Sequence, residues 1–241
     1  NNTTGAGNVA VGSGALDANT TGASNIAVGI NALSANTTAA NNTAVGAAAL
    51  AGNTTATGGV GIGYRALNVN TTGANNTAVG SDALLANTTG NTNTAVGSRT
   101  LQANTTGDRN TAVGFQSLVA LNPSSNADMY NTGVGYDAGA AVTTGVNNTF
   151  IGGLAGDATD DGANNVAVGK SALSANCGDS NTAIGAGALS LTTATNNTAV
   201  GKDAGGAVTT GIDNTFVGGL AGDATDDGAA NVASPARPPT N

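Results

Sequence analysis

The stretch NTTGANNTAVG, residues 70–80, decides the fold, because nearly the same eleven letters recur along a chain of 241 residues. The glycine that ends it follows Val or Ile in each copy and so marks one position of a repeat. The marker glycines are Gly12, Gly29, Gly46, Gly63, Gly80, Gly97, Gly114, Gly135, Gly152, Gly169, Gly185, Gly201 and Gly218. Nine of the twelve steps between them are 17 residues long, which predicts thirteen copies of one structural unit.

Each unit carries the pattern of a short strand followed by a tight turn. In Thr77-Ala78-Val79 the outer residues are β-branched, and a glycine closes the segment. A second apolar segment, Ala83-Leu84, is expected to form a second short strand, and ANTTG at residues 86–90 is typical of a longer turn. We expect Ala, Val and Leu to fill the interior of each coil.

Two strands and two turns in 17 residues predict an all-β fold, a parallel β-solenoid or β-roll of about 13–14 coils with two short strands per coil. Successive coils of such a fold stack about 4.8 Å apart. Because each thin coil buries little apolar surface, we expect the chain to associate with copies of itself, as a trimer or a filament.

The repeat predicts a single solenoid domain over residues 1–234, followed by a Pro-rich tail at 235–241. One step of 21 residues contains an insertion in one turn, at 122–131. The block at 137–167 reappears at 203–233, which indicates an internal duplication. Because the chain begins with Asn rather than Met, we expect a processed chain or a fragment.

An asparagine stands four residues before the marker glycine in every unit but one, where Gly59 replaces it. Stacked Asn side chains can hydrogen-bond from coil to coil, so we expect them to form a structural ladder. Its members are Asn8, Asn25, Asn42, Asn76, Asn93, Asn110, Asn131, Asn148, Asn165, Asn181, Asn197 and Asn214.

The duplicated block changes the apolar residues of the unit. Glycines replace the usual Leu at positions 139, 156, 205 and 222, and each pair of glycines brackets one Phe, Phe150 or Phe216. One interpretation is that each Phe fills the interior space that two Leu leave. The alternative is an open face, on which the rings cover a contact between subunits.

The composition limits the function. The chain has no His, and its 14 acidic residues are all Asp, so few groups suit acid–base catalysis and we expect no enzyme. A net charge of -8 disfavours nucleic acid as a partner. No apolar run reaches the roughly 18 residues of a membrane span, so no membrane insertion is expected. Cys177, the only cysteine, is either a small residue in a turn or one half of a disulfide between subunits.

The Asn-Thr-Thr turns have two interpretations. The residues simply form the turn, or they accept N-linked sugars, because Asn-x-Thr is the acceptor sequence. The candidate glycosylation sites are Asn19, Asn36, Asn53, Asn70, Asn87 and Asn104, and further sequons lie at Asn1, Asn41, Asn75, Asn147 and Asn196. O-linked sugars on the Thr residues are an equal alternative.

GDATDDG occurs twice and places three carboxylates in one turn each time. The candidate metal ligands are Asp157, Asp160, Asp161, Asp223, Asp226 and Asp227. Ca²⁺ prefers clustered oxygen ligands, although a solvated acidic turn explains the same residues, and we expect no other cofactor. Ice binding through Thr ladders is a further hypothesis, but adjacent Thr residues in a turn do not share one face.

The units resemble a known family. The motif N-x-x-A-[VI]-G-x-x-A, found in SNIAVGINAL at 24–33 and NNVAVGKSAL at 164–173, is similar to the head repeats of trimeric autotransporter adhesins. Arrays of NTAVG and NTTG also resemble those of phage tail-fibre proteins. The resemblance implies a left-handed β-roll, three chains side by side, and a location outside the cell, at the cell surface or in a virion tail fibre.

Three hypotheses of function follow. The first is a non-enzymatic extracellular structural fibre, an adhesin or tail-fibre-like shaft that contacts a surface or cell-surface glycans. The second is a subunit of a self-assembling head-to-tail extracellular filament that carries sugars. The third, of lower weight, is an ice-binding or calcium-binding solenoid.

Overall fold

A computed structural model describes residues 2–224 and 228–234 of the chain. The described residues contain strands and turns but no helix, and they form a parallel β-solenoid of about 13 turns with a repeat of about 17 residues. This confirms the predicted fold class. The chain divides into two compact units, Asn1–Asn131 and Thr132–Asn241, and the division falls at the end of the insertion.

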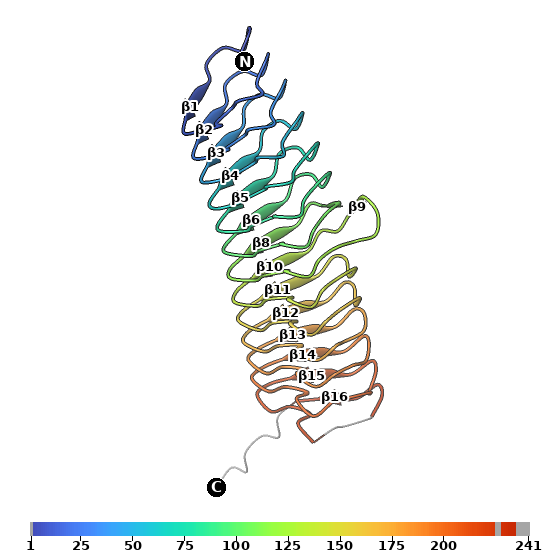
Figure 1. The fold of residues 1–241 in the computed structure, drawn as a ribbon. Helices are drawn as coiled ribbons and strands as arrows, with labels where there is room; N and C mark the ends of the chain where they lie inside the picture. Colours follow the sequence, from blue (N-terminus) through green and yellow to red (C-terminus); the bar gives the residue numbers. More distant parts are fainter. Residues whose placement is uncertain (1, 225–227, 235–241) are drawn as a thin grey trace. The chain divides into compact units, whose positions relative to one another are not determined.

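In the first unit each coil contributes one strand to a parallel sheet (Figure 1). The strands are β1 (Val9–Val11), β2 (Ile26–Val28), β3 (Thr43–Val45), β4 (Val60–Ile62), β5 (Thr77–Val79), β6 (Thr94–Val96) and β8 (Thr111–Val113). They pair in register, so that Thr77 lies beside Thr94 and Val79 beside Val96. Two shorter strands, β7 (Gly107–Asp108) and β9 (Ala127–Asp128), form a separate parallel pair.

The second unit repeats this arrangement. Its strands are β10 (Thr132–Val134), β11 (Thr149–Ile151), β12 (Val166–Val168), β13 (Thr182–Ile184), β14 (Thr198–Val200), β15 (Thr215–Val217) and β16 (Val232–Ala233). Each strand pairs in parallel with the next, as in the contact of Thr182 with Thr198. The two coils that are one residue shorter keep the same register at their strands.

Each three-residue strand turns its middle residue inward and its outer residues outward. Ala44, Ala78 and Ala95 are fully buried, whereas Val45 and Val96 remain 37% and 36% exposed. This follows from the alternation of side chains along a strand. The expectation that the Val of each strand fills the interior is therefore wrong, because the strand contributes its middle residue to the core, beside the Leu that follows the turn.

The second strand expected at the Leu segment is absent from the described coils. The segment is a series of turns, in which Leu84 has φ 48° and Asp82 has φ 57°. Leu84 nevertheless donates its N–H to the carbonyl of Thr100 in the next coil, at 3.0 Å. A left-handed residue costs about 1–2 kcal/mol, and complete burial of a Leu side chain returns about 1.5–3 kcal/mol, so the buried Leu can hold this backbone.

The marker glycine is required by conformation and by space. Gly80 has φ 137°, and a Cβ atom built on it would lie 2.5 Å from the carbonyl oxygen of Gly97 in the next coil. Both restrictions recur at the equivalent glycine of the neighbouring coils. The positive φ at all thirteen marker glycines, with the close approach of successive backbones at most of them, therefore explains the glycine at this corner.

The two Phe residues occupy the interior of the second unit. Phe150 and Phe216 are fully buried. A Cβ atom on Gly156 would lie 2.5 Å from Cδ1 of Phe150, and one on Gly222 would overlap the ring of Phe216 in the same way. The exchange of Leu for Gly beside Phe is thus confirmed as a packing exchange, and the alternative of an open Phe face is wrong.

Candidate functional surfaces

The expected Asn ladder runs along the start of the strands. Asn25 donates its backbone N–H to Oδ1 of Asn8 at 2.8 Å, and its own Nδ2 donates to the carbonyl of Ala39 at 2.8 Å. Amide-to-amide bonds also occur, as from Nδ2 of Asn93 to Oδ1 of Asn76 at 3.2 Å. The main rung thus joins a side chain of one coil to the backbone of the next. Of the twelve ladder residues, Asn8 is half-buried and the other eleven are buried.

A second Asn ladder runs through the Asn-Thr-Thr turns of the first unit. Nδ2 of Asn70 donates to Oδ1 of Asn53 at 3.0 Å and to the carbonyl of Gly73 at 2.9 Å. Nδ2 of Asn87 donates in turn to Oδ1 of Asn70 at 2.8 Å. The members of this turn ladder are Asn19, Asn36, Asn53, Asn70, Asn87 and Asn104, all of them at most 1% exposed.

These six asparagines are the candidate glycosylation sites of the sequence. A sugar would replace a hydrogen on Nδ2 and would need solvent around it, but both hydrogens of Asn70 Nδ2 are donated inside the protein. In the folded chain the structure therefore corrects this assignment, and the six residues form the turn and its ladder. The sequons at Asn41, Asn75 and Asn196 are exposed, and glycosylation there stays a prediction.

The two Thr residues of each turn differ in their surroundings. The hydroxyl of Thr71 donates to the carbonyl of Thr88 in the next coil at 3.0 Å, and Thr88 donates to Thr105 at 3.1 Å. In the six turns of the turn ladder, the second Thr is exposed in four, as at Thr72, and half-buried at Thr89 and Thr106. Of the two hydroxyls, the exposed second one is the site on which an O-linked sugar would meet the least steric conflict.

In the second unit, other buried residues take the place of the turn ladder. They are Val142, Thr159, Cys177, Thr192 and Val208. The thiol of Cys177 lies 3.3 Å from the hydroxyl of Thr159 and is 2% exposed. Burial raises the pKa of this thiol. A disulfide between subunits does not fit this position, and Cys177 serves as a small interior residue.

The acidic turns do not form a metal site in the described part of the chain. No group of three His, Cys, Asp or Glu side chains there could hold a metal ion, so Asp157, Asp160 and Asp161 are not brought together. Asp160 instead accepts a hydrogen bond from the hydroxyl of Thr143. Desolvation raises the pKa of Asp157. Asp223 is exposed, and the candidates Asp226 and Asp227 lie outside the described residues.

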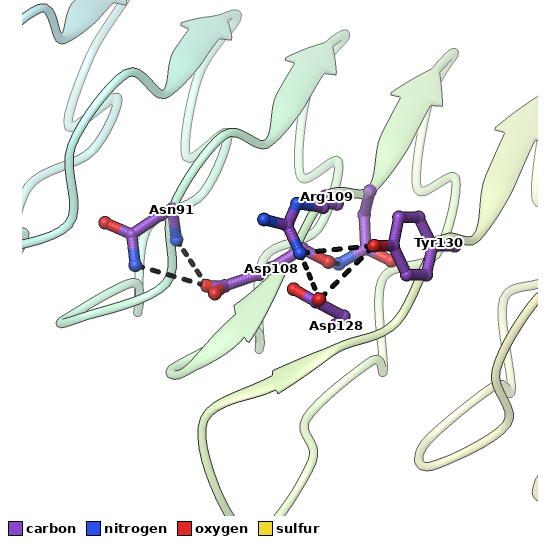
Figure 2. A network of polar contacts seen from close by, with 6 residues as sticks. Asn91, Asp108, Arg109, Asp128 and Tyr130 are labelled. Atoms are coloured by element: carbon purple, nitrogen blue, oxygen red, sulfur yellow. Dashed lines mark hydrogen bonds and ion pairs between the residues drawn. The ribbon is translucent and has the colours of Figure 1, made fainter.

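The insertion adds a small exposed network to the first unit (Figure 2). Arg109 forms an ion pair with Asp128, and its guanidinium lies 5.6 Å from the centre of the Tyr130 ring. The hydroxyl of Tyr130 donates to Asp128 at 3.2 Å. Exposed ion pairs of this kind contribute about 0–1 kcal/mol, so the network orients Tyr130 at the surface more than it stabilises the fold.

The insertion was expected as a loop within one turn, and the structure adds an ordered part to it. Within it, Pro123 and Met129 are buried, and β9 pairs with β7. Asp108 of β7 also accepts the backbone N–H of Asn91 at 2.6 Å (Figure 2). The buried Met129 side chain and the β7–β9 pair therefore join the insertion to the coil before it.

The outward sides of the strands form the most regular surface of the first unit. The outer residues of β2, β3, β4, β5, β6 and β8 are Thr, Val or Ile, and none is charged. This surface was not expected from the sequence, because the Val residues of the strands were expected in the core. The pattern β-branched, Ala, β-branched was the signal for it, since a buried Ala in the middle requires the flanking side chains to point outward.

No family model, no curated protein and no solved structure matches the chain. The fold alone identifies it as a β-solenoid repeat protein. Within the described residues, no helix is long and apolar enough to cross a membrane.

Proposed function

We propose that the chain is a non-enzymatic extracellular structural fibre that acts as a rigid shaft, on which the insertion presents a surface contact. The observation that carries this proposal is the turn ladder of the first unit. In it, each buried Asn amide from Asn19 to Asn87 bonds to the coil before it and to the coil after it, as Asn70 does between Asn53 and Asn87.

This arrangement suits a shaft because the coils cannot move independently. A bend that separated two coils would break the bonds of both Asn ladders and of the Thr hydroxyls at that level. A hydrogen bond contributes about 0.5–1.5 kcal/mol net, and a buried polar group left without a partner costs about 1–3 kcal/mol. Opening one coil boundary therefore costs several such bonds at once, which favours a stiff solenoid.

The surface contact is supported by the insertion network. Tyr130 is 52% exposed, and Arg109 and Asp128 hold its ring at the surface. An aromatic ring beside charged groups suits a partner that offers both apolar faces and hydroxyls, as cell-surface glycans do. The resemblance to adhesin heads and tail fibres agrees with an extracellular, cell-surface or virion location and with self-association as a trimer.

Removal of whole coils tests the shaft. Deletion of residues 30–80 removes three complete repeats and joins Gly29 to Ser81 in register. We expect a folded protein whose longest dimension in small-angle scattering falls by about 14 Å, at about 4.8 Å per coil. Deletion of residues 64–72 is the matched control, because it leaves half a coil and should abolish folding by circular dichroism. A folded half-coil variant, or an unfolded three-coil variant, would contradict the proposal.

The state of assembly is tested on the native material. Electron microscopy and sedimentation velocity should show discrete trimers if the chain is an adhesin-like shaft. Long particles with an axial repeat of thirteen or fourteen coils, about 62–67 Å, would instead establish the alternative of a head-to-tail filament subunit. Chains that remain single in both measurements would contradict self-association.

A further inference from the structure

The strands of the first unit present two straight rows of outward side chains, which we call the Thr/Val face. One row contains Ile26, Thr43, Val60, Thr77, Thr94 and Thr111, and the other contains Val28, Val45, Ile62, Val79, Val96 and Val113. Every member is β-branched and so has restricted side-chain freedom. The in-register pairing places equivalent members at one coil spacing along each row (Figure 1).

The Thr hydroxyls of this face are unlike those of the turns. In the turns, the hydroxyl of Thr71 donates to the next coil. On the face, the hydroxyls of Thr77, Thr94 and Thr111 form no hydrogen bond with another residue of the described chain. These three hydroxyls are therefore available to a ligand, and they point outward in a regular row.

The Thr/Val face also carries no charge, although the whole chain has a net charge of -8. A regular patch of exposed and half-exposed apolar groups indicates an interaction surface. Because neither row has a charged or long polar side chain, the face offers nothing for an ionic ligand. What it offers is a lattice of methyl groups and hydroxyls in fixed positions.

The spacing of this lattice is close to that of ordered water. Equivalent hydroxyls on successive coils lie about 4.8 Å apart, and the two rows lie about 6.6 Å apart, two residues along a strand. Water molecules joined tetrahedrally by hydrogen bonds of about 2.75 Å have second neighbours about 4.5 Å apart. The mismatch of about 0.3 Å per coil reaches about 1 Å over three steps, so groups of three or four coils can match such a lattice at one time.

We propose that the Thr/Val face binds the surface of ice. The hydroxyls of Thr77, Thr94 and Thr111 take the places of lattice waters, while the methyl groups between them exclude disordered water from the contact. The inference does not depend on the shaft function, since it uses only the outward side chains of the strands. The adjacent Thr residues of the turns do not share one face, whereas the Thr residues of the sheet do.

The experiment compares ice growth in solutions of the full chain and of two double variants. Thr77→Tyr with Thr94→Tyr places two bulky rings on the face. Thr55→Tyr with Thr72→Tyr, the matched control, places the same rings on exposed turn residues. The readouts are the rate of ice recrystallisation and the fraction of protein retained in slowly grown ice, with serum albumin as a blank and circular dichroism to confirm folding.

We expect the unmodified chain and the turn variant to slow recrystallisation at micromolar concentration and to enter the ice. The face variant should lose at least tenfold in potency. Exclusion of the unmodified chain from ice, or equal activity of the two folded variants, would overturn the proposal. So would a soluble oligomer that dissociates only in the face variant, because that result would make the Thr/Val face a contact between copies of the chain.

Discussion

The side-chain amide of Asn70 donates a hydrogen bond of 3.0 Å to Oδ1 of Asn53, exactly one repeat earlier in the chain, and accepts one of 2.8 Å from Asn87, one repeat later. Each such residue is fully buried. A polar side chain can be buried in this narrow core because its amide is satisfied by the equivalent Asn of both neighbouring coils and by the carbonyl of Gly73 in its own turn. The repeat of the sequence is thus a condition for the burial of its asparagines.

Replacement of Asn70 by Ala should strongly destabilise the first unit. The change leaves Oδ1 of Asn53 and the carbonyl of Gly73 without their donor, at a cost of about 1–3 kcal/mol for each buried group. We therefore expect the free energy of unfolding to fall by about 3 kcal/mol in urea denaturation. Asn75→Gly is the control, because Asn75 is exposed and has φ 57°, which glycine adopts freely. It should change stability by less than about 1 kcal/mol, and equal losses in both variants would refute the role of the ladder.

Two adjacent glycines of the second unit offer a matched test of the corner. Gly152 has φ 132°, and a Cβ on it would lie 2.6 Å from the carbonyl oxygen of Gly169, whereas the nearest atom to a Cβ on Gly153 is 4.0 Å away. Gly152→Ala should lower stability by about 3 kcal/mol or more, since strain and overlap add. Gly153→Ala should be neutral or stabilising by up to about 1 kcal/mol. Thermal melts of the two variants measure the difference, and similar melting temperatures would contradict it.

The sequence repeat allowed the strands and the first Asn ladder to be predicted, but it did not allow the turn ladder to be predicted. The strand before Gly80 and the ladder at Asn76, the residue before that strand, were predictable, because β-branched residues and Asn recur there at a fixed spacing. The turn ladder was not, because Asn70 in an Asn-Thr-Thr-Gly turn has the composition of an exposed loop, and composition does not say which way a turn side chain points.

The supposed second strand failed for a related reason. The apolar pair Ala83-Leu84 was expected to form a strand, but left-handed residues at Asp82 and Leu84 produce a tight bend in which both Ala83 and Leu84 are buried. Apolar residues indicate which side chains are buried and leave the sign of φ open. The left-handed conformation is selected because the chain must close a coil within 17 residues. That constraint belongs to the whole coil and cannot be read from the local sequence.

The packing exchange at Phe150 predicts a double-mutant result. Phe150→Ala should cost about 3–5 kcal/mol, because it empties a fully buried site. Gly156→Leu alone should also be destabilising, since its side chain would overlap the Phe150 ring. The two changes together recreate the Ala and Leu of an ordinary coil, and Gly156 has φ 61°, near the φ of 50° of Leu173 in the next coil. The double variant should therefore be more stable than either single variant in urea denaturation, and simple additivity of the two losses would contradict the exchange.

The thiol of Cys177 predicts how stability depends on pH in the alkaline range. Burial raises the pKa of this thiol in the folded chain above its value in the unfolded chain. The unfolded chain therefore loses the proton first as pH rises, so the stabilising contribution is complete below the unfolded pKa and is lost as pH rises through the folded pKa. Melting temperatures measured between about pH 7 and pH 10 should fall more in the unmodified chain than in Cys177→Ser, because an unperturbed Cys titrates near 8.5.

The same burial should make the thiol of the native protein react with a disulfide reagent at least tenfold more slowly than the thiol of the urea-unfolded protein. Equal pH profiles for the two chains, together with rapid modification of the native thiol, would show that Cys177 is not an interior residue of its coil.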